Sequence, residues 1–277
     1  MKTLRLGLIG GNITASRSPV LHCVCALSMG GNASYDLIIP AERGRSFAQL
    51  LQDCQSQGFD GVNVTYPHKE EAAALVAPAG PVVAAMGAAN TIRFGTDGPR
   101  AHNTDHSGFV AAFRAGFGAT APGRVLVLGA GGVGRAVAFA LADLGASAII
   151  LHDTDPARAA SLATALRPRF AGPLEITAPD LHDLAGYDGV ANCTPLGMAG
   201  LPGSALPDGA RGAPGWAFDA VYTPEHTPFR AQVQAMGAAF LSGYELYVHQ
   251  GLQAFEIFSG QPLRDPAWVR TVIDHRP

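Results

Sequence analysis

The sequence contains little charge, few cysteines and no long hydrophobic run. Only 15% of its 277 residues are charged, and the formal net charge is −3. It therefore offers no basic patch for nucleic acid or an anionic membrane surface, and we expect neither as a partner. No apolar run reaches the length of a transmembrane helix. The first residues, MKTLRLGLIGG, lack the hydrophobic region and cleavage site of a signal peptide, so we expect a cytoplasmic protein.

The four cysteines indicate neither a disulfide framework nor a metal centre. Cys23 and Cys25 stand beside His22 in a predicted helix, where side chains two positions apart point away from each other. We therefore interpret them as buried apolar thiols and expect no bound metal.

What the sequence does contain is a regular alternation of short apolar runs and helical stretches. This alternation is typical of βαβ units and predicts an α/β fold. Strands are predicted over residues 4–9, 35–39, 61–65, 89–94, 124–128, 148–152, 189–194 and 216–221. Helices are predicted over residues 19–29, 43–57, 68–76, 107–115, 135–144, 244–259 and 266–275. Domain boundaries are expected near residues 105–109 and near Ser242, and the Gly/Pro-rich segment 197–215 is expected to be a loop.

A lysine occupies an unusual place in the stretch GVNVTYPHKEE, residues 61–71. The first half is typical of a strand that stops at Pro67, and a helix is predicted to follow. Lys69 then falls in the first helical turn, where the partial positive charge of the helix end favours Asp or Glu. It is either a solvated surface charge or a lysine whose proton is labile.

A glycine-rich turn, GAGGVG, stands directly between a predicted strand and a predicted helix. Gly129, Gly131 and Gly134 match G-x-G-x-x-G, which permits a tight turn, close approach of a pyrophosphate and packing of helix on strand. Asp153 ends the next strand, where a carboxylate accepts hydrogen bonds from the adenine ribose of NAD. The pattern predicts a dehydrogenase. Alternatively, the turn is an ordinary βαβ connection, and Asp153 begins a turn or caps the next helix.

Further motifs occur in a fixed order around this turn. They are SRSP (16–19), NVTYPHK (63–69), AANT (88–91), NTD (103–105), NCTPLGM (192–198), DAVY (219–222) and the helix containing Gln250. Together they resemble the shikimate dehydrogenase family, including its quinate/shikimate branch, over nearly the whole chain. The resemblance implies an N-terminal α/β substrate-binding and catalytic domain with a mixed sheet, formed by residues 1–105 plus 243–277. It also implies a Rossmann-type, doubly wound NAD(P)-binding domain over residues 106–242.

The resemblance also implies roles for individual residues. Lys69 and Asp105 would form the catalytic pair. The substrate carboxylate would be held by Ser16, Ser18 and Tyr222, and the ring hydroxyls by Asn63, Thr65, Asn90, Gln250 and Asp105. The cofactor would be held by Gly129, Ala130, Gly131, Gly132, Val133, Gly134, Asp153, Thr154, Arg158, Thr194, Pro195, Val221 and Gly243.

Oxidation of a secondary alcohol removes a hydride from carbon and a proton from oxygen, so a group that exchanges a proton near the oxygen helps both directions. Lys69 is the candidate for this role. Alternatively it stays charged and stabilises negative charge that develops on oxygen, with proton exchange through water. The sequence favours neither role.

Simpler interpretations exist for several of these residues. Ser18 before Pro19 would make a good helix N-cap, and Asp105 could cap the helix expected near Ser107. Tyr222 could be a half-buried strand aromatic.

Three further polar residues have open roles. Asn90 and Gln250 could serve backbone groups, as buried amides often do. His106 stands where the family usually has a small residue, and it either touches ligand or fills space.

The expected function is an NAD-preferring oxidoreductase that interconverts shikimate and 3-dehydroshikimate by hydride transfer, with quinate and 3-dehydroquinate as a second pair. The alternatives are a methylene-tetrahydrofolate dehydrogenase-like enzyme and a catalytically idle NAD-binding sensor. Family members that use NADP typically carry Asn-Arg-Thr and a further Arg after the second Rossmann strand. Here HDTDPAR (152–158) keeps only Arg158 and presents Asp153 and Asp155 to a 2′-phosphate. The expected partner is the small-molecule substrate, and the expected assembly is a monomer or homodimer.

Overall fold

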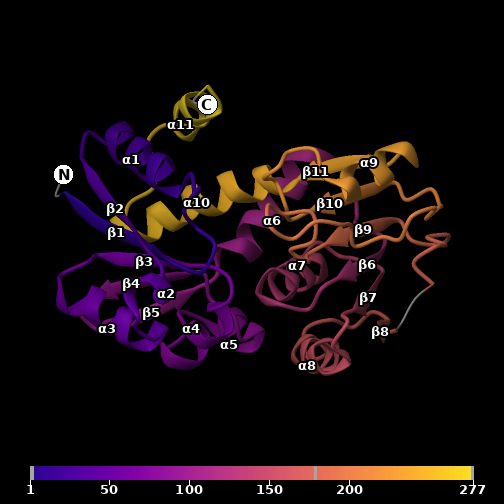
Figure 1. The fold of residues 1–277 in the computed structure, drawn as a ribbon, viewed down its shortest axis with the longest axis horizontal. Coiled ribbons are helices and arrows are strands. Elements are labelled where there is room, and N and C mark those ends of the chain that lie inside the picture. The colour runs from indigo at the N-terminus through magenta and orange to yellow at the C-terminus, as the bar shows by residue number, and fades with distance from the viewer. Residues whose placement is uncertain (1–2, 178–179, 276–277) are drawn as a thin grey trace. The chain divides into compact units, whose positions relative to one another are not determined.

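The structure, a computed structural model, describes residues 3–177 and 180–275. The chain divides into two compact units, whose elements are labelled in Figure 1. Unit 1 consists of the described parts of Met1–Thr104 and Val248–Pro277, and unit 2 of the described part of Asp105–Tyr247. The second boundary falls inside the helix α10 (Gly243–Ser259).

Unit 1 is built on a five-stranded mixed sheet with the strand order β2-β1-β3-β4-β5. Its strands are β1 (Leu4–Ile9), β2 (Ala33–Ile38), β3 (Gly61–Val64), β4 (Thr91–Gly95) and β5 (Gly98–His102). β1 pairs in parallel with β2 and β3, whereas the β3–β4 and β4–β5 pairs are antiparallel. Its helices, besides part of α10, are α1 (Ser18–Ser28), α2 (Pro40–Arg43), α3 (Phe47–Ser56), α4 (Lys69–Leu75), α5 (Pro81–Met86) and α11 (Pro266–Asp274).

The amphipathic helix α3 contributes one side of the core of unit 1. A capping box between Ser46 and Gln49 begins this helix. Its buried residues Phe47 and Leu51 belong to the same apolar cluster as Val62 of β3. On another part of the unit, α11 lies against α1, as Figure 1 shows. The apolar cluster also includes Ile9 and Val64, the last residues of β1 and β3, after which polar motifs follow.

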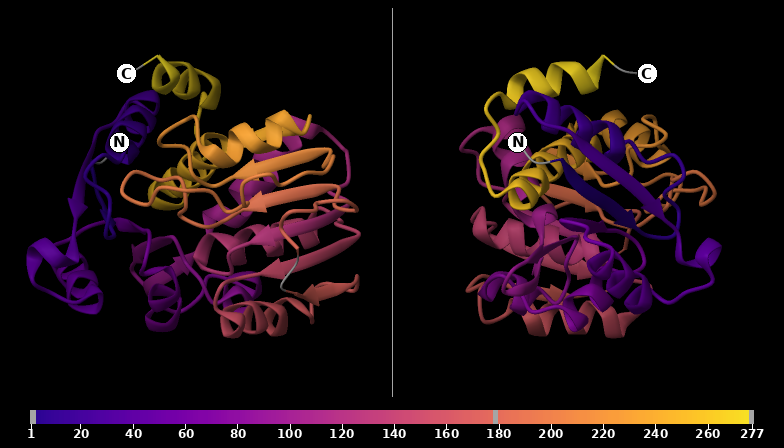
Figure 2. Two further views of the ribbon diagram at one scale, coloured as in Figure 1. Left: turned by 45° about the vertical axis from the view of Figure 1, so that its right-hand side comes forward. Right: turned by 90° about the vertical axis from the view of Figure 1, so that its left-hand side faces the viewer.

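Unit 2 is built on a six-stranded parallel sheet with the strand order β11-β10-β9-β6-β7-β8, seen side by side in the left view of Figure 2. Its strands are β6 (Arg124–Leu128), β7 (Ala148–His152), β8 (Leu174–Ile176), β9 (Gly189–Asn192), β10 (Trp216–Asp219) and β11 (Ala239–Ser242). Its helices are α7 (Gly132–Asp143), α8 (Pro156–Leu166) and α9 (Pro228–Ala235), and α6 (Thr104–Phe117) begins at the boundary.

The order of these strands is that of a doubly wound dinucleotide fold. Numbered along the chain within the unit, it is 3-2-1-4-5-6, which reverses between β6 and β9. The predicted α/β fold, with one mixed sheet and one Rossmann-type sheet, is confirmed. Ligands of such sheets bind beyond the carboxyl ends of the strands at the reversal.

Several predicted elements differ from the structure. The helix predicted over residues 43–57 is two helices, because α2 ends at Arg43 and Ser46 caps a new one. The strands predicted to reach residues 194 and 221 end at Asn192 and Asp219. Strands β5, β8 and β11 were not predicted, since they are short or lack apolar alternation.

No helix in the described ranges is long and apolar enough to cross a membrane. Among the same residues, no cluster of three or more His, Cys, Asp or Glu side chains could hold a metal ion. All four cysteines are free thiols.

Candidate active site

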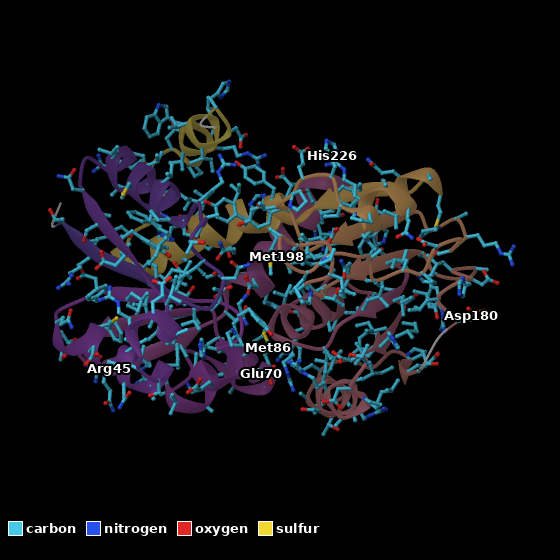
Figure 3. All side chains as sticks on the ribbon, viewed as in Figure 1. Arg45, Glu70, Met86, Asp180, Met198 and His226 are labelled. Carbon is cyan, nitrogen blue, oxygen red and sulfur yellow. The ribbon has the colours of Figure 1, made fainter. Side chains whose placement is uncertain are left out.

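Lys69 lies in the first turn of α4, as predicted, although this helix begins at Lys69 itself and not at His68. The preceding residue, His68, stacks its ring on Phe47 with a centroid distance of 5.0 Å, and its Nδ1 lies 3.0 Å from Oε2 of Glu71. Glu70, labelled in Figure 3, is exposed, whereas Lys69 is half-buried. The first turn therefore carries the acids expected at a helix N-terminus beside the lysine.

Backbone contacts tie three of the sequence motifs together. The backbone N–H of Ala89 donates to the carbonyl of Lys69 at 2.8 Å. Nδ2 of Asn103 donates to the carbonyl of Ala88 at 2.8 Å. The backbone N–H of Thr104 donates to Oδ1 of Asn90 at 2.7 Å. NVTYPHK, AANT and the first two residues of NTD are thus neighbours in unit 1.

Asp105 follows Thr104 as the first residue of unit 2. It is 5% exposed and lies in the first turn of α6, which begins at Thr104. Asp105 is therefore inside the helix, and the interpretation of this residue as its N-cap is wrong.

Polar side chains from six separate segments of unit 1 form one series of polar contacts. Oγ of Ser16 donates to Oγ of Ser18 at 3.1 Å, and the Ser18 side chain in turn interacts with the phenol of Tyr35. Tyr35 donates to Oδ1 of Asn63 at 2.8 Å, and Nδ2 of Asn63 donates to Oγ1 of Thr91 at 3.0 Å. We call this series the polar relay.

The polar relay continues through Asn90. Thr91 donates to Oδ1 of Asn90 at 3.0 Å, and Nδ2 of Asn90 donates to Thr104 at 2.9 Å and to Oε1 of Gln250 at 3.3 Å. Four predicted substrate residues beyond Ser16 (Ser18, Asn63, Asn90 and Gln250) thus belong to a single network.

Two of the predicted substrate residues are held in other ways. The half-buried Thr65 donates its backbone N–H to the carbonyl of Ile9 at 3.0 Å. The half-buried Tyr222 lies beyond β10, so it is not a strand aromatic, and its ring stacks on that of Tyr247 with a centroid distance of 5.3 Å.

The N-cap interpretation of Ser18 is wrong. Ser18 is the first helical residue of α1, Arg17 is the N-cap, and no side-chain capping bond is made. Instead the backbone N–H of Ser18 donates to Oγ of Ser16 at 3.2 Å. The Ser18 hydroxyl therefore faces the polar relay rather than the helix end.

The glycine-rich turn of unit 2 has the shape that a dinucleotide needs. Gly129 has φ +95°, a conformation that side chains disfavour, and a Cβ there would lie 3.0 Å from the carbonyl carbon of Cys193. A Cβ on Gly134 would collide with the carbonyl oxygen of Gly129. Gly131 is the N-cap of α7, so Gly132 and Val133 open the helix whose N-terminus suits a pyrophosphate.

Asp153 is bound to this turn. Its Oδ2 accepts the backbone N–H of Ala130 at 2.7 Å, and its Oδ1 accepts that of Asp155 at 2.9 Å. Asp153 thus begins a turn, as one interpretation held. The cap of α8 is Asp155, which accepts the N–H of Ala157 at 3.0 Å, so the interpretation of Asp153 as the cap is wrong.

The other two predicted cofactor residues of this loop are Thr154 and Arg158. Thr154 is exposed. A Cβ on Gly131 would lie 3.3 Å from Nη2 of Arg158, so this guanidinium lies over the glycine-rich turn.

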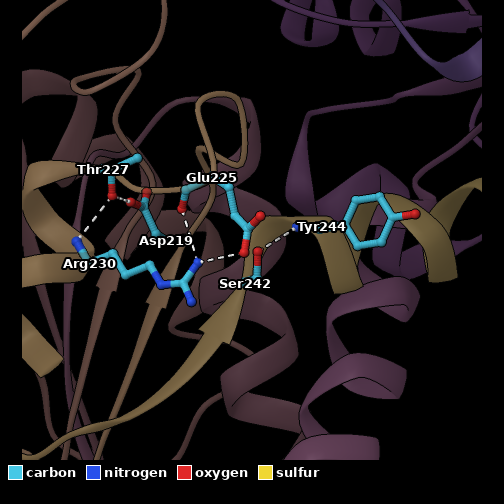
Figure 4. Close-up of polar contacts among 6 residues, drawn as sticks. All are labelled: Asp219, Glu225, Thr227, Arg230, Ser242 and Tyr244. Carbon is cyan, nitrogen blue, oxygen red and sulfur yellow. Dashed lines mark hydrogen bonds and ion pairs between the residues drawn. The ribbon is translucent and has the colours of Figure 1, made fainter. Parts of the chain in front are cut away.

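A buried carboxylate, Asp219, organises the segments beyond β9 and β10. Its Oδ1 accepts Nδ2 of Asn192 and the backbone N–H of Val221, each at 3.0 Å. Its Oδ2 accepts the hydroxyl of Thr227, which caps α9 (Figure 4). Oδ1 of Asn192 accepts the N–H of Thr194 at 3.0 Å.

The predicted cofactor residues Thr194 and Val221 are thus placed by two residues that sequence reasoning missed, although Asn192 and Asp219 begin the motifs NCTPLGM and DAVY. Pro195, which follows Thr194, is exposed. Gly243 lies so close to the Ala220 carbonyl that a Cβ there would collide with it.

Burial raises the pKa of Asp219 to about 6, although its three hydrogen-bond donors favour the carboxylate. Because the native state binds this proton more tightly than the unfolded state, the resulting stability is fully present below pH 3.8 and is lost as the pH rises through about 6. The loss is of the order of 3 kcal/mol. Asp219→Asn, which keeps an acceptor oxygen, should remove this dependence. Thermal unfolding of both proteins between pH 4 and about 7 tests it; parallel curves would contradict the expectation.

His106 does not have the free imidazole that a ligand contact would use. Its Nε2 lies 3.0 Å from Oδ2 of Asp143 at the end of α7. Burial lowers the pKa of His106, and Asp143 acts in the opposite direction. The pair therefore links α6 to α7 within unit 2.

Comparison with known proteins identifies similar proteins along nearly the whole chain. Residues 8–92 match the family model described as the shikimate dehydrogenase substrate binding domain. A quinate/shikimate dehydrogenase (NAD(+)) of Corynebacterium efficiens is 36% identical over 265 residues, 93% of each chain. A shikimate dehydrogenase (NADP(+)) of Streptomyces avermitilis is 37% identical over 275 residues, 97% of this chain and 94% of its own. The solved structure of quinate dehydrogenase from Corynebacterium glutamicum in complex with NAD has a TM-score of 0.87 and 31% identity, and 99% of each chain is covered.

Proposed function

The chain belongs to the shikimate dehydrogenase family, and from this premise we propose that it is an NAD-preferring oxidoreductase that interconverts shikimate and 3-dehydroshikimate. Quinate and 3-dehydroquinate are the second substrate pair that we propose. Unit 1 would bind the substrate, and unit 2 would bind the dinucleotide. Relatives carry names with NAD and with NADP, so the preference for NAD rests on this chain's own loop.

The polar relay is the observation that carries the proposal. Shikimate presents one carboxylate and several ring hydroxyls, and it needs hydroxyl and amide groups in one place. Segments as distant as residues 16 and 250 supply such groups to the polar relay. An ordinary core rarely gathers so many side-chain to side-chain bonds.

Unit 2 supports the cofactor assignment through the close packing at Gly129 and Gly134 and through Asp153 beside them. The nicotinamide ring, when bound, exchanges a hydride with the substrate carbon. The protein would hold the alcohol and exchange the proton of its oxygen. We assign this proton exchange to Nζ of Lys69 together with Asp105.

A single assay tests this function. Purified protein is mixed with NAD and with shikimate, quinate or methylene-tetrahydrofolate, and reduced nicotinamide is followed by absorbance. Turnover with shikimate supports the proposal. Turnover with methylene-tetrahydrofolate alone would favour the folate alternative. Binding of NAD without turnover of any substrate would favour the idle sensor.

Ser16→Ala should raise the KM for shikimate and change kcat little. Ser16 donates its hydroxyl to Ser18 in the free protein, and we expect it to turn to the substrate carboxylate. A hydrogen bond to a charged group contributes about 1.5–3 kcal/mol. If this bond is equally strong in the ground state and in the transition state, its loss raises KM and leaves kcat unchanged. Ser28→Ala, which removes a hydroxyl bonded to the carbonyl of Cys25, is the control. An unchanged KM would reject the contact.

A further inference from the structure

Both side-chain N–H groups of Asn63, a predicted substrate residue, are engaged within the protein. Its Nδ2 donates to Oγ1 of Thr91 at 3.0 Å and to the carbonyl of Asn90 at 3.3 Å. Its Oδ1 accepts the phenol of Tyr35 at 2.8 Å. Asn63 is 6% exposed, so the protein itself satisfies this amide.

His22 completes the surroundings of the amide. Its imidazole interacts with the Asn63 side chain, which raises the pKa of His22 against the larger effect of burial. Nδ1 of His22 has no hydrogen-bond partner among the described residues. The ring also stacks on Tyr35 with a centroid distance of 4.8 Å and an interplanar angle of 13°. Burial keeps His22 neutral by lowering its pKa to about 3, so the stack carries no charge at assay pH.

Tyr35 interacts with Asn63 on one side and with Ser18 on the other. It donates its proton to Oδ1 of Asn63 at 2.8 Å, and the Ser18 side chain acts on its phenol oxygen, which lowers the pKa of Tyr35 against the larger effect of burial. Tyr35 therefore joins Ser18, predicted to hold the carboxylate, to Asn63 on the ring-hydroxyl side. No other side chain of the polar relay joins these two groups directly.

We propose that Tyr35, packed on His22, is a positioning residue that sets the distance and orientation between the carboxylate-binding and hydroxyl-binding parts of the substrate site. In this arrangement Asn63 orients Thr91 and Asn90 and does not itself donate to the substrate. The inference rests on the proposed function and deepens it, because it names the side chain that fixes substrate geometry from behind the contact residues.

Tyr35→Phe tests the proposal, because it keeps the ring that stacks on His22 and removes only the hydroxyl. We expect the KM for shikimate to rise about tenfold, as for the loss of one or two hydrogen bonds. The KM for NAD and kcat should stay close to those of the parent protein, and the midpoint of thermal unfolding should fall by no more than the loss of one partly buried hydrogen bond causes. Tyr187→Phe, at a tyrosine of unit 2 whose ring lies 5.7 Å from the Arg124 guanidinium, is the matched control.

A double-mutant cycle adds a measurement that a merely structural role would not affect. Once Ser18→Ala has removed one end of the contact, Tyr35→Phe should raise KM by a smaller factor than in the parent. Equal factors, or a rise in both KM values together with a lower unfolding midpoint, would overturn the proposal.

The side-chain amide signals of Asn63 test the same contact without turnover. They are identified in a ¹⁵N spectrum by their loss in Asn63→Asp. Tyr35→Phe should shift them and Tyr187→Phe should not; unshifted signals would overturn the inference even in a protein that oxidises shikimate. Failure of the parent protein to oxidise shikimate would instead count against the proposed function.

Discussion

Lys69→Ala should lower kcat for shikimate oxidation by about 100- to 10,000-fold, the usual contribution of a proton-exchanging side chain. The backbone of Lys69 is fixed, since its carbonyl accepts the N–H of Ala89 and the residue opens α4. Removal of the side chain beyond Cβ should therefore leave the helix and the cofactor affinity unchanged. Steady-state kinetics with circular dichroism tests this. A variant with half of the parent kcat would reject Lys69 as catalytic.

Two variants show which role Lys69 plays. Lys69→Arg keeps a positive charge but cannot release a proton near neutral pH. Near-complete loss of kcat in Lys69→Arg would favour proton exchange, whereas substantial recovery over Lys69→Ala would favour stabilisation of oxygen charge. Glu70→Ala, in the same turn, is the control and should retain kcat because Glu70 is exposed.

The composition of the chain makes Nζ of Lys69 directly observable. Lys2 and Lys69 are the only two lysines of the sequence. In a Lys2→Arg background, ¹³C-methylation leaves a single lysine signal beside that of the N-terminal amine. The titration of this signal reports the protonation state of Nζ of Lys69 at the assay pH. The two roles require different protonation states.

The motifs predicted most of the candidate site because short-range patterns encode it. G-x-G-x-x-G between strand and helix identifies its own geometry. Lys69 falls at a helix start because the strand ends at Val64 and a turn containing Pro67 separates it from α4. The partners of these residues were not predictable. Tyr35 and Asn63 are separated by 28 residues, and nothing in the sequence of β2 distinguishes Tyr35 from an ordinary strand aromatic.

The wrong prediction of Ser18 as an N-cap and the failure to predict β5 have the same physical origin. Ser18 has the residue type and the following proline of an N-cap, but the competing bond from its N–H to Ser16 moves the helix start. β5 has the sequence GPRAH, without apolar alternation, and it forms because the turn before it pairs it with β4. In both cases a contact outside the local pattern decides the outcome.

The unmodified protein should use NAD with a higher kcat/KM than NADP. Both carboxylates of the HDTDPAR loop are fixed by backbone bonds, Asp153 to Ala130 and Asp155 to Ala157, so neither can turn away from a 2′-phosphate without losing a bond. A carboxylate offers about four acceptor positions, and Asp153 can therefore accept ribose hydroxyls while it holds the turn. Steady-state kinetics with both cofactors at saturating shikimate tests this.

Conversion of the loop should reverse the preference. Asp153→Asn, Thr154→Arg and Asp155→Thr, made together, restore the Asn-Arg-Thr pattern ahead of Arg158. The fold should tolerate them, because Asn keeps an acceptor for the Ala130 N–H and Thr is a good N-cap for α8. The kcat/KM ratio of NADP to NAD should rise at least about tenfold. Glu42→Gln with Asp53→Asn, which removes two carboxylates from unit 1, should leave the ratio unchanged.

The size of the expected preference for NAD over NADP depends on charge repulsion and on the position of Arg158. Two unit charges about 4 Å apart interact by roughly 4 kcal/mol at an effective dielectric near 20, and solvent around the exposed Asp155 reduces this value. Even about 1.4 kcal/mol is tenfold in affinity. The counter-argument is that Arg158 could bind the 2′-phosphate alone. However, its guanidinium lies over Gly131 at the pyrophosphate turn, so reaching the ribose side would take it from that position. An equal or higher kcat/KM for NADP in the unmodified protein would show that Arg158 outweighs both carboxylates.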